Sequence, residues 1–583
     1  MEISYKKINN LDLFKNFEDV ELLNMETCQN YIPLYNNFFT LNETNYNSIN
    51  LNNQNNLHSL IKKQTENIFL GRIQNENNDI IEKNIFFKLC PLLDPFKYMA
   101  GQYDICDNNL MTLPKLKNDN SHYKIKDKNN SSYVDSFFTY LTSQLYNRLH
   151  FFHGLDFYGS YLGYKKNLHI DIGDDIDMLA DKDFFHKNTN TLFTFINSEH
   201  KELFKEDTRC NKKVLNLGDN INLNDLDNND NILNLTDITS LDDINDNNNN
   251  NNNNTDISSI EIYLSSTNQD NKITSIKSSN STKSTNLSNS DFSSRSSNTE
   301  NSENSENSEN SENSENSENS DEIYSDDSSD VESIMVSIDK FPIQVIALEK
   351  CSNTLDYLFI EDKLTHEELG GIILQILMML ITYQKLFNLT HNDLHTNNIM
   401  YIETDKTYLY YKLNNKHYKV KTFGKIFKII DFGRAIYEYK NNRICSDSFH
   451  NEGDASSQYN CEPYYNKDKP CIEPNYSFDL CRLGCSIYDF ITEKYETLEE
   501  IREPIYKIIM SWCDDDTGRS ILYKTNGEER YPDFKLYKMI ARKVHNHRPI
   551  DEINNKYFNK YIVPKKEIKK GSKICNIDIL ESV

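Results

Sequence analysis

Two short stretches hold the side chains that could perform chemistry. The first is HNDLHTNNIM, in which Asp393 and Asn398 lie five residues apart, and the second is KIIDFG, which contains Asp431. Carboxylate and amide oxygens are hard ligands of the kind that Mg²⁺ takes in proteins, together with water and phosphate oxygens. Asn398 and Asp431 could therefore hold a metal–nucleotide, while Asp393 remains free to accept a proton from an incoming hydroxyl.

A lysine far upstream, Lys88 in the stretch NIFFKLCPLL, could hold the phosphates of the same nucleotide from the opposite side. Taken singly, each of these residues is better interpreted as a surface lysine or a solvated loop acid. Their joint order and spacing along the chain favour one active site.

The elements that must position these residues follow from the apolar periodicity. Residues 84–93 predict a strand with Lys88 within it, and 341–351 predict another strand rich in Val, Ile and Leu. Residues 132–152 predict an amphipathic helix, and 366–387 predict a long helix that is apolar on most faces. The second helix leads directly into the loop that contains Asp393.

Short strands separated by polar turns follow that loop, and the last of them, KIFKIID, ends at Asp431. The stretch TYLYYKLNNKHYKVKTFG predicts a hairpin with Asn-Asn-Lys at its tip, which we interpret as a surface extension. Residues 480–492 predict a further apolar helix. Strands come mainly first and helices mainly later, which predicts a strand-rich part and a helical part.

The middle of the chain has a different composition. Residues 186–338 include a run of asparagines and six tandem NSE units, and they cannot bury enough apolar surface to offset the chain entropy. We expect a disordered insertion within the strand-rich part. The predicted organisation is an N-terminal extension (1–67), the strand-rich part (68–185 and 339–350), the helical part (351–555) and a C-terminal tail (556–583).

The bulk composition excludes several classes of protein. The formal net charge of −26 disfavours a general surface for nucleic acid or anionic membrane. We find no apolar run of about 18 residues and no signal peptide, so we expect neither a membrane span nor secretion. The 12 cysteines are then reduced thiols of a cytoplasmic protein. A zinc site among Cys461, Cys471, Cys481 and Cys485 is disfavoured because they form no C-x-x-C pair.

The two stretches resemble the conserved loops of eukaryotic-type protein kinases. The residues His391–Asn398 are similar to the catalytic loop H-R-D-x-x-x-x-N, and Asp431–Gly433 to the metal-binding D-F-G. The resemblance implies an α+β, bilobal protein-kinase-like fold with a small β-rich lobe, which carries the insertion, and a larger helical lobe. The Asn-rich bias is similar to that of proteins from amoebal giant viruses, for which the location would be the host cytoplasm or the virion.

The resemblance also implies roles for individual residues. Those of the catalytic loop are His391, Asp393 and His395. Those that would hold ATP are Lys88, its ion-pair partner Asp135, and Glu349 and Cys351, whose backbone would bond adenine. Those that would hold Mg²⁺ are Asn398 and Asp431. In addition, Asp479 would brace the catalytic-loop backbone, and Arg548 would pair with the Glu of an A-P-E motif, for which CEP and IEP both compete.

The chain departs from the family pattern in four places. No G-x-G-x-x-G precedes Lys88, where the stretch FLGRIQNENNDIIEKN offers only Gly71. Asp135 stands where a Glu is expected, and it could instead be an acid favoured by the helix dipole. Asn392 replaces the Arg that reads activation-loop phosphorylation, and His395 replaces a Lys. The gap between Asp393 and Asp431 is about twice the usual one.

The resulting prediction is an ATP- and Mg²⁺-dependent protein kinase that acts on serine or threonine rather than tyrosine. Two alternatives stay open. A pseudokinase that binds partners would explain the missing glycine-rich loop, and a small-molecule phosphotransferase of the same fold would explain the HNDLH loop.

Overall fold

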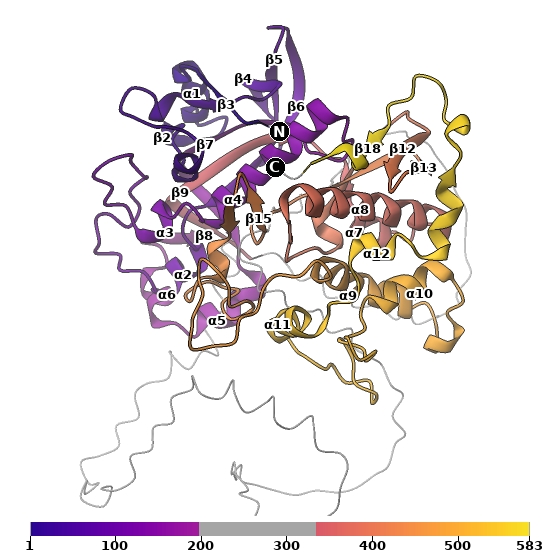
Figure 1. The fold of residues 1–583 in the computed structure, drawn as a ribbon. Helices are drawn as coiled ribbons and strands as arrows, with labels where there is room; N and C mark the ends of the chain where they lie inside the picture. The colour runs from indigo at the N-terminus through magenta and orange to yellow at the C-terminus, as the bar shows by residue number, and fades with distance from the viewer. Residues whose placement is uncertain (1, 197–333, 582–583) are drawn as a thin grey trace, which may run out of the picture. The chain divides into compact units, whose positions relative to one another are not determined.

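A computed structural model describes residues 2–196 and 334–581, all of which belong to one compact unit with a mixed fold of β-sheets and α-helices (Figure 1). The Asn run and the NSE units lie outside the described residues. The main sheet has the strand order β2-β7-β9-β6-β5-β4, with β8 paired to β9, and every pair is antiparallel. Its strands are β2 (Met25–Gln29), β4 (Asn55–Lys63), β5 (Ile68–Asn75), β6 (Ile80–Pro91), β7 (Phe157–Asp171), β8 (Phe193–Phe195) and β9 (Met335–Glu349).

Strand β6 explains why Lys88 is available for chemistry. Successive side chains of a strand point to opposite faces. Ile85 and Phe87 are fully buried on one face, so Lys88 points to the other. Helix α4 (Ser131–Leu149) packs near β7 and β9, and Asn130 caps it by accepting from the N–H of Ser132. The expected amphipathic helix is therefore present, but residues 132–145 are buried on all faces.

A small sheet of order β10-β11-β14 positions the two motif loops. Its strands are β10 (Asn353–Thr354), β11 (Ile399–Glu403) and β14 (Lys425–Ile429). Helix α8 (His366–Phe387) has the bounds predicted from the sequence, and it packs near α10 (Pro504–Ser511) and α12 (Pro549–Glu552). Figure 1 shows these helices close to α7 (Leu355–Ile360) and α9 (Phe478–Thr492), and α11 (Phe534–Lys543) packs against α9.

Helix α8 is long and apolar enough to cross a membrane by length and composition alone. The expectation that no segment reaches that threshold is therefore wrong. However, 94% of the helix's most apolar window is buried inside the fold, as in the core helix of a globular protein.

The predicted hairpin is confirmed, but the prediction that it is a surface extension is wrong. Strands β12 (Tyr408–Leu413) and β13 (Lys416–Lys421) pair antiparallel, and Asn414 and Asn415 form the tip with φ of 52° and 59°. The pair forms the middle of a four-stranded sheet, of order β17-β13-β12-β18, with β17 (Ile562–Val563) and β18 (Cys575–Asn576). The carboxylate of Asp578 accepts from the N–H groups of both tip residues.

Several predicted boundaries are displaced. The first segment, 1–67, is part of the fold, because β2 and β4 belong to the main sheet and α1 (Leu11–Glu18) packs near both. The predicted insertion is too wide at both ends, because α6 (Asp183–Asn188), β8 and the start of β9 fall within 186–338. The C-terminal residues 556–583 provide β17 and β18. Composition alone did not reveal these short elements because their apolar residues are few.

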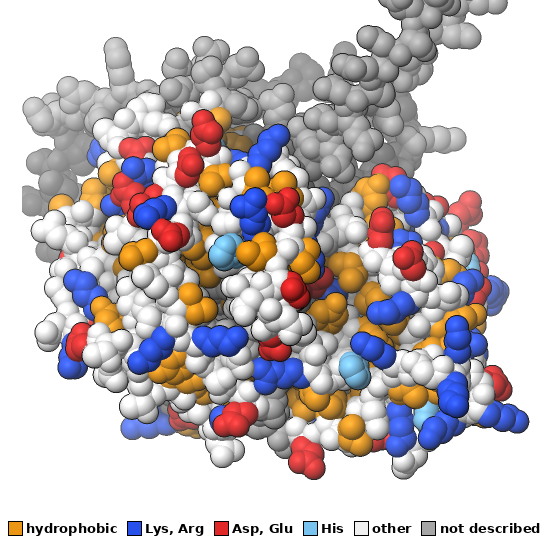
Figure 2. All heavy atoms as spheres, turned by 90° about the horizontal axis from the view of Figure 1, so that it is seen from above, with side chains coloured by type: hydrophobic (Ala, Val, Ile, Leu, Met, Phe, Trp, Pro, Cys, Tyr) orange, Lys and Arg blue, Asp and Glu red, His pale blue; other side chains and the backbone are white. Residues whose placement is uncertain are grey.

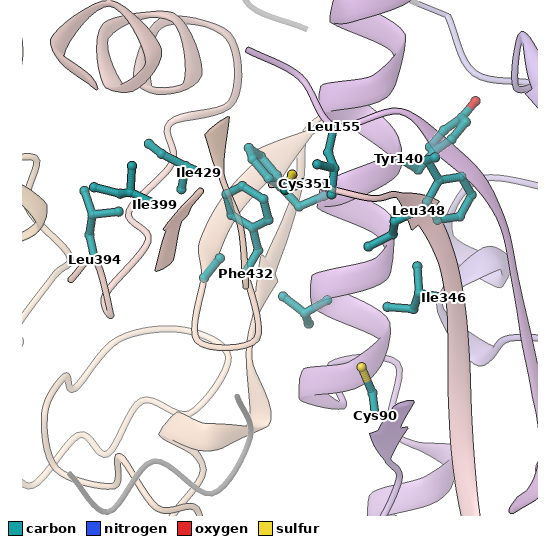
Figure 3. Close-up of a cluster of buried hydrophobic side chains, with 14 of the residues drawn as sticks. Cys90, Tyr140, Leu155, Ile346, Leu348, Cys351, Leu394, Ile399, Ile429 and Phe432 are labelled. Atoms are coloured by element: carbon teal, nitrogen blue, oxygen red, sulfur yellow. The ribbon is translucent and has the colours of Figure 1, made fainter. Parts of the chain in front are cut away.

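The core is continuous from the main sheet to the helices. Figure 3 shows Ile346 and Leu348 of β9 on one side and Ile399 and Ile429 on the other, with Phe432 between them. On the face shown in Figure 2, acidic and basic side chains are interspersed with apolar ones.

His153 connects α4 to the small sheets from inside this core. It is fully buried, with Nδ1 2.7 Å from the carbonyl oxygen of Phe427 and Nε2 2.7 Å from the hydroxyl of Tyr411. The carbonyl can only accept, so Nδ1 carries the proton and Nε2 accepts from the phenol. Burial, aided by Lys428, lowers the pKa of His153 to about 3.

We expect His153 to make stability depend on pH. Between about pH 6.5 and 3 the histidine is protonated in the unfolded chain but stays neutral in the folded protein. The contribution of His153 to the unfolding free energy therefore falls by about 1.4 kcal/mol per pH unit as the pH is lowered. Urea unfolding of wild type and His153→Gln at several pH values between 7.5 and 4.5 measures this. The stability gap between them should shrink on acidification. The exposed His58 provides the control His58→Gln. A gap independent of pH would contradict the assignment.

Candidate functional site

Lys88 lies between two carboxylates that come from different elements. Its Nζ is 2.7 Å from Oδ2 of Asp135 on α4 and 2.9 Å from Oδ1 of Asp431, which follows β14. The side chains of both acids are at least 95% buried, and that of Lys88 is 14% exposed. The structure thus brings together three residues that are far apart in the sequence. Asp135 follows Lys88 by 47 positions, and Asp431 follows Asp135 by 296 positions.

The charges of this triad depend on one another. Burial opposes the charge of Lys88, but the carboxylates of Asp135 and Asp431 outweigh it, so the pKa of Lys88 lies above its usual value. Burial also opposes the charge of Asp431, and Lys88 overcomes it, so the pKa of Asp431 lies below its usual value. Lys88 and Asp431 therefore remain charged at neutral pH.

Asp135 also fixes the loop that follows Asp431. Its Oδ1 accepts from the backbone N–H of Phe432 at 2.8 Å. Asp431 itself adopts a left-handed backbone with φ of 63°, a conformation that aspartate tolerates better than most residues. A strained backbone of this kind persists only where surrounding contacts hold it in place. Here these contacts come from Lys88 and Asp135.

The loop 391–398 lies next to Asp431 because of strand pairing. Ile399 pairs with Ile429 in the β11–β14 ladder, and the N–H of Ile430 donates to the carbonyl of Asn398 at 3.0 Å. The amide nitrogen of Asn398 donates to the carbonyl of Asp393 at 2.9 Å and to Nε2 of His395 at 3.1 Å. The amide oxygen of Asn398 is therefore the atom that can take a cation.

The buried loop is held through its backbone. Oδ2 and Oδ1 of Asp479, at the start of α9, accept from the N–H groups of His391 and Asn392, each at 2.9 Å. This is the brace that the sequence predicted for Asp479. The Nε2–H of His391 donates to the carbonyl of Ile430 at 2.9 Å, so His391 links the loop to the end of β14. His391 therefore positions the backbone.

Asn392 performs a structural task. It has φ of 66°, and its amide nitrogen donates to the carbonyl of Arg434 at 2.9 Å while its oxygen accepts from the hydroxyl of Tyr459 at 2.7 Å. The side chain is fully buried. Asn392 thus ties the loop to the segment beyond Gly433 by neutral hydrogen bonds.

Glu349 and Cys351 lie at the end of β9, where the chain passes to the small sheet. The side chain of Glu349 is occupied, because its Oε1 accepts from the N–H of Asp156 at 2.8 Å and from the buried Nζ of Lys428. Burial raises the pKa of the Cys351 thiol to about 12, so this thiol stays neutral. The backbone N–H of Glu349 is also occupied, because it donates to the carbonyl of Asp156 at 2.9 Å. That the backbone of Glu349 and Cys351 bonds adenine stays a prediction.

A cavity of about 550 Å³ adjoins the triad and includes Asp135, Asp431 and Gly433 in its lining. The segment around Asp447 closes another side of it. Asp447 accepts from Nζ of Lys124 at 2.5 Å and from the N–H of Ser131, at the start of α4, at 2.9 Å. The cavity thus reaches Asp135 and Asp431, whereas its lining does not include Lys88, Asp393 or Asn398.

The predicted pairing of Arg548 with the Glu of an A-P-E motif is wrong. Nε of Arg548 pairs with Asp551 at 2.6 Å on the surface, because Arg548 begins a short helix that provides its own acid three residues on. Glu473 of the IEP stretch pairs with Arg443 instead. Gly71 lies in mid-strand, where a Cβ would stand 2.5 Å from Cδ1 of Ile85, so it serves packing. The turn beside Lys88 is 64–67, where the N–H of Phe87 donates to Asn67.

Sequence reasoning missed Tyr537 and Lys428. The hydroxyl of Tyr537 donates to Oδ1 of Asp393 at 2.8 Å. Lys428 is fully buried and joins β14 to Glu349 and to the carbonyl of Gly154. Neither residue belongs to a motif, and the one signal for Lys428 was a lysine inside the apolar strand KIFKII.

Comparison with known proteins adds no assignment, since neither a family model nor a curated protein matches this chain.

Removing Lys88 should leave two carboxylates buried without their cation. We expect Lys88→Met to lower the unfolding free energy at pH 7.5 by about 3–5 kcal/mol. Lys88 is the largest of the groups that oppose the effect of burial on Asp431, so the pKa of this carboxyl should rise without it. The variant should therefore regain stability as the pH falls and this carboxyl takes up a proton.

Urea unfolding at pH 7.5 and 5.5 checks this expectation. The matched control is Lys83→Met, which removes an exposed lysine from the same strand and should change stability by less than about 0.5 kcal/mol. Equal losses for both variants, or a Lys88→Met deficit that does not vary with pH, would show that the triad is not an electrostatic unit.

Proposed function

We propose that this chain is a kinase that transfers the γ-phosphoryl group of ATP to a serine or threonine hydroxyl of a protein, on a two-lobed protein-kinase-like fold. The observation that carries the proposal is the convergence of Lys88, Asp135 and Asp431 beside the loop that contains Asp393 and Asn398. The sequence alone predicts each of these residues for this chemistry.

The donor set fits Mg²⁺. Asp431 provides a carboxylate whose Oδ1 contacts Lys88, and Asn398 provides an amide oxygen; both are hard ligands on adjacent strands. When bound, Mg²⁺ would neutralise charge on the phosphate oxygens. Lys88 would contact the phosphates, and the backbone at Glu349 and Cys351 would bond adenine.

Asp393 acts on the acceptor. It is buried and lies in a loop fixed by Asp479, so its position is set before substrate binds. A fixed carboxylate can orient the acceptor hydroxyl and take up its proton. Oδ2 of Asp393 lies 3.9 Å from Nε2 of His395, so the two side chains are close enough to interact electrostatically.

Asn392 and Asp447 support activity without phosphorylation of the chain. Asn392 links the loop to Arg434 and Tyr459, and Asp447 links its segment to Lys124 and to the start of α4. These contacts hold the segment beyond Gly433 in place with residues already present. The proposed kinase is therefore active as synthesised.

A second candidate is a nucleotide-binding protein that transfers no phosphate. The turn 64–67 beside Lys88 favours it, because this turn has no glycine and carries Glu66, paired with Lys63 at 2.5 Å. An acid near the phosphates would weaken their binding. A small-molecule phosphotransferase is the third candidate, for which the HNDLH loop is the argument.

We expect purified protein to transfer labelled phosphate from ATP to a protein substrate panel in the presence of Mg²⁺. Asp393→Asn and Asp431→Asn should each reduce transfer by about 10²–10⁴-fold, because each removes a group that acts at the phosphoryl centre. The matched control, Asp405→Asn, removes an exposed acid between β11 and β12 and should retain full activity.

The outcomes separate the candidates. Thermal stabilisation by ATP without transfer to any acceptor would favour the non-transferring candidate, and transfer only to small molecules would favour the third. Transfer that survives Asp393→Asn would contradict the role given to this residue.

A further inference from the structure

Side chains from two helices that come later in the sequence are linked to the carboxylate of Asp393. The hydroxyl of Tyr537, on α11, donates to Oδ1 of Asp393 at 2.8 Å, and Nε of Arg482, on α9, donates to the Tyr537 oxygen at 2.8 Å. The exposed fractions of Asp393, Tyr537 and Arg482 are 4%, 6% and 5%. The chain from guanidinium to phenol to carboxylate is thus almost closed to water.

The direction of these bonds follows from the groups themselves. A guanidinium has donors only, so the Tyr537 oxygen must accept from Arg482. The single phenol proton is then directed to Asp393. The ring is held as well, because the guanidinium carbons of Arg434 and Arg482 lie 5.6 and 5.1 Å from its centroid. Phe478 packs against it at a tilt, and Phe534 stacks on it.

We propose that Tyr537 is a positioning residue for the phosphoryl transfer, one that holds Oδ1 of Asp393 so that Oδ2 receives the acceptor's proton. This inference rests on the proposed function. In the step, the acceptor oxygen forms a bond to the γ-phosphorus, the bond from that phosphorus to the bridging oxygen of ADP breaks, ADP leaves, and the hydroxyl proton passes to Oδ2 of Asp393.

Other charged or titratable groups face Asp393 and set the background for this bond. They come from the loop itself, from α9, from α11 and from the segment beyond Gly433. They are His391, His395, Asp479, Arg482, Tyr537 and Arg434. Among these groups, the phenol of Tyr537 donates to Oδ1 of Asp393 at 2.8 Å, and this bond fixes the orientation of the carboxylate.

The test replaces the hydroxyl and keeps the ring. Tyr537→Phe should lower kcat by about 10- to 100-fold with KM for ATP within about twofold, because orientation of the base is lost and nucleotide contacts remain. A merely structural residue would not lower kcat while leaving KM for ATP unchanged.

The matched control is Tyr523→Phe. Its hydroxyl donates to Oδ1 of Asp489 at 2.9 Å, a bond of the same kind outside the site. This variant should leave kcat and KM for ATP as in wild type. A faster Tyr537→Phe enzyme would overturn the proposal, because the hydroxyl would then obstruct the acceptor. An unchanged kcat would overturn it as well.

A measurement that needs no activity separates this inference from the proposed function. Denaturation midpoints of Asp393→Asn, Tyr537→Phe and the double variant form a cycle, in which the double variant should lose less than the sum of the single losses. Additive losses alongside normal wild-type transfer would overturn the inference alone. Absence of wild-type transfer would overturn it together with the proposed function, whatever the cycle shows.

Discussion

The ion pairs of Lys88 with Asp135 and Asp431 are the interaction on which the rest of the structure depends. They join β6 of the main sheet, the helix α4 and the end of β14, and all three groups are largely withdrawn from water. A buried carboxylate without a cation is costly, so the three elements must meet if the charges are to remain. The positions of the sheet, of α4 and of the Asp431 loop are thereby coupled.

The loop 391–398 depends on a second constraint, the satisfaction of its own backbone. The loop is buried, and buried N–H groups must find acceptors. The carboxylate of Asp479 accepts from two of them, and the loop carbonyl of Asn398 accepts from the N–H of Ile430. Asn392 suits this environment because it tolerates a left-handed backbone and offers both a donor and an acceptor. A cationic side chain at this buried position would need an anion beside it. The neutral amide of Asn392 needs none.

Segments that resemble appendages in the sequence complete the fold. The N-terminal residues supply β2 and β4 to the main sheet, and the C-terminal residues supply β17 and β18 to the sheet built on the β12–β13 hairpin. Exposed strand edges carry unpaired backbone groups, which neighbouring strands satisfy. The hairpin between Asp393 and Asp431 is consequently a structural element, and Tyr411 from it reaches His153 in the core.

The sequence by itself determined the local elements and the identity of the charged residues. Helix 366–387, the strand that carries Lys88 and the hairpin tip follow from apolar periodicity and turn residues, which are properties of neighbouring positions. The sequence allows two interpretations of Asp135, as the ion-pair partner of Lys88 or as an acid favoured by the helix dipole. The contact with Lys88 in the tertiary structure decides for the first. The pairing of Arg548, the role of Asn392 and the contact of Tyr537 with Asp393 were decided by tertiary structure alone. Each depends on which distant side chain shares a buried space, and no local pattern encodes that distance.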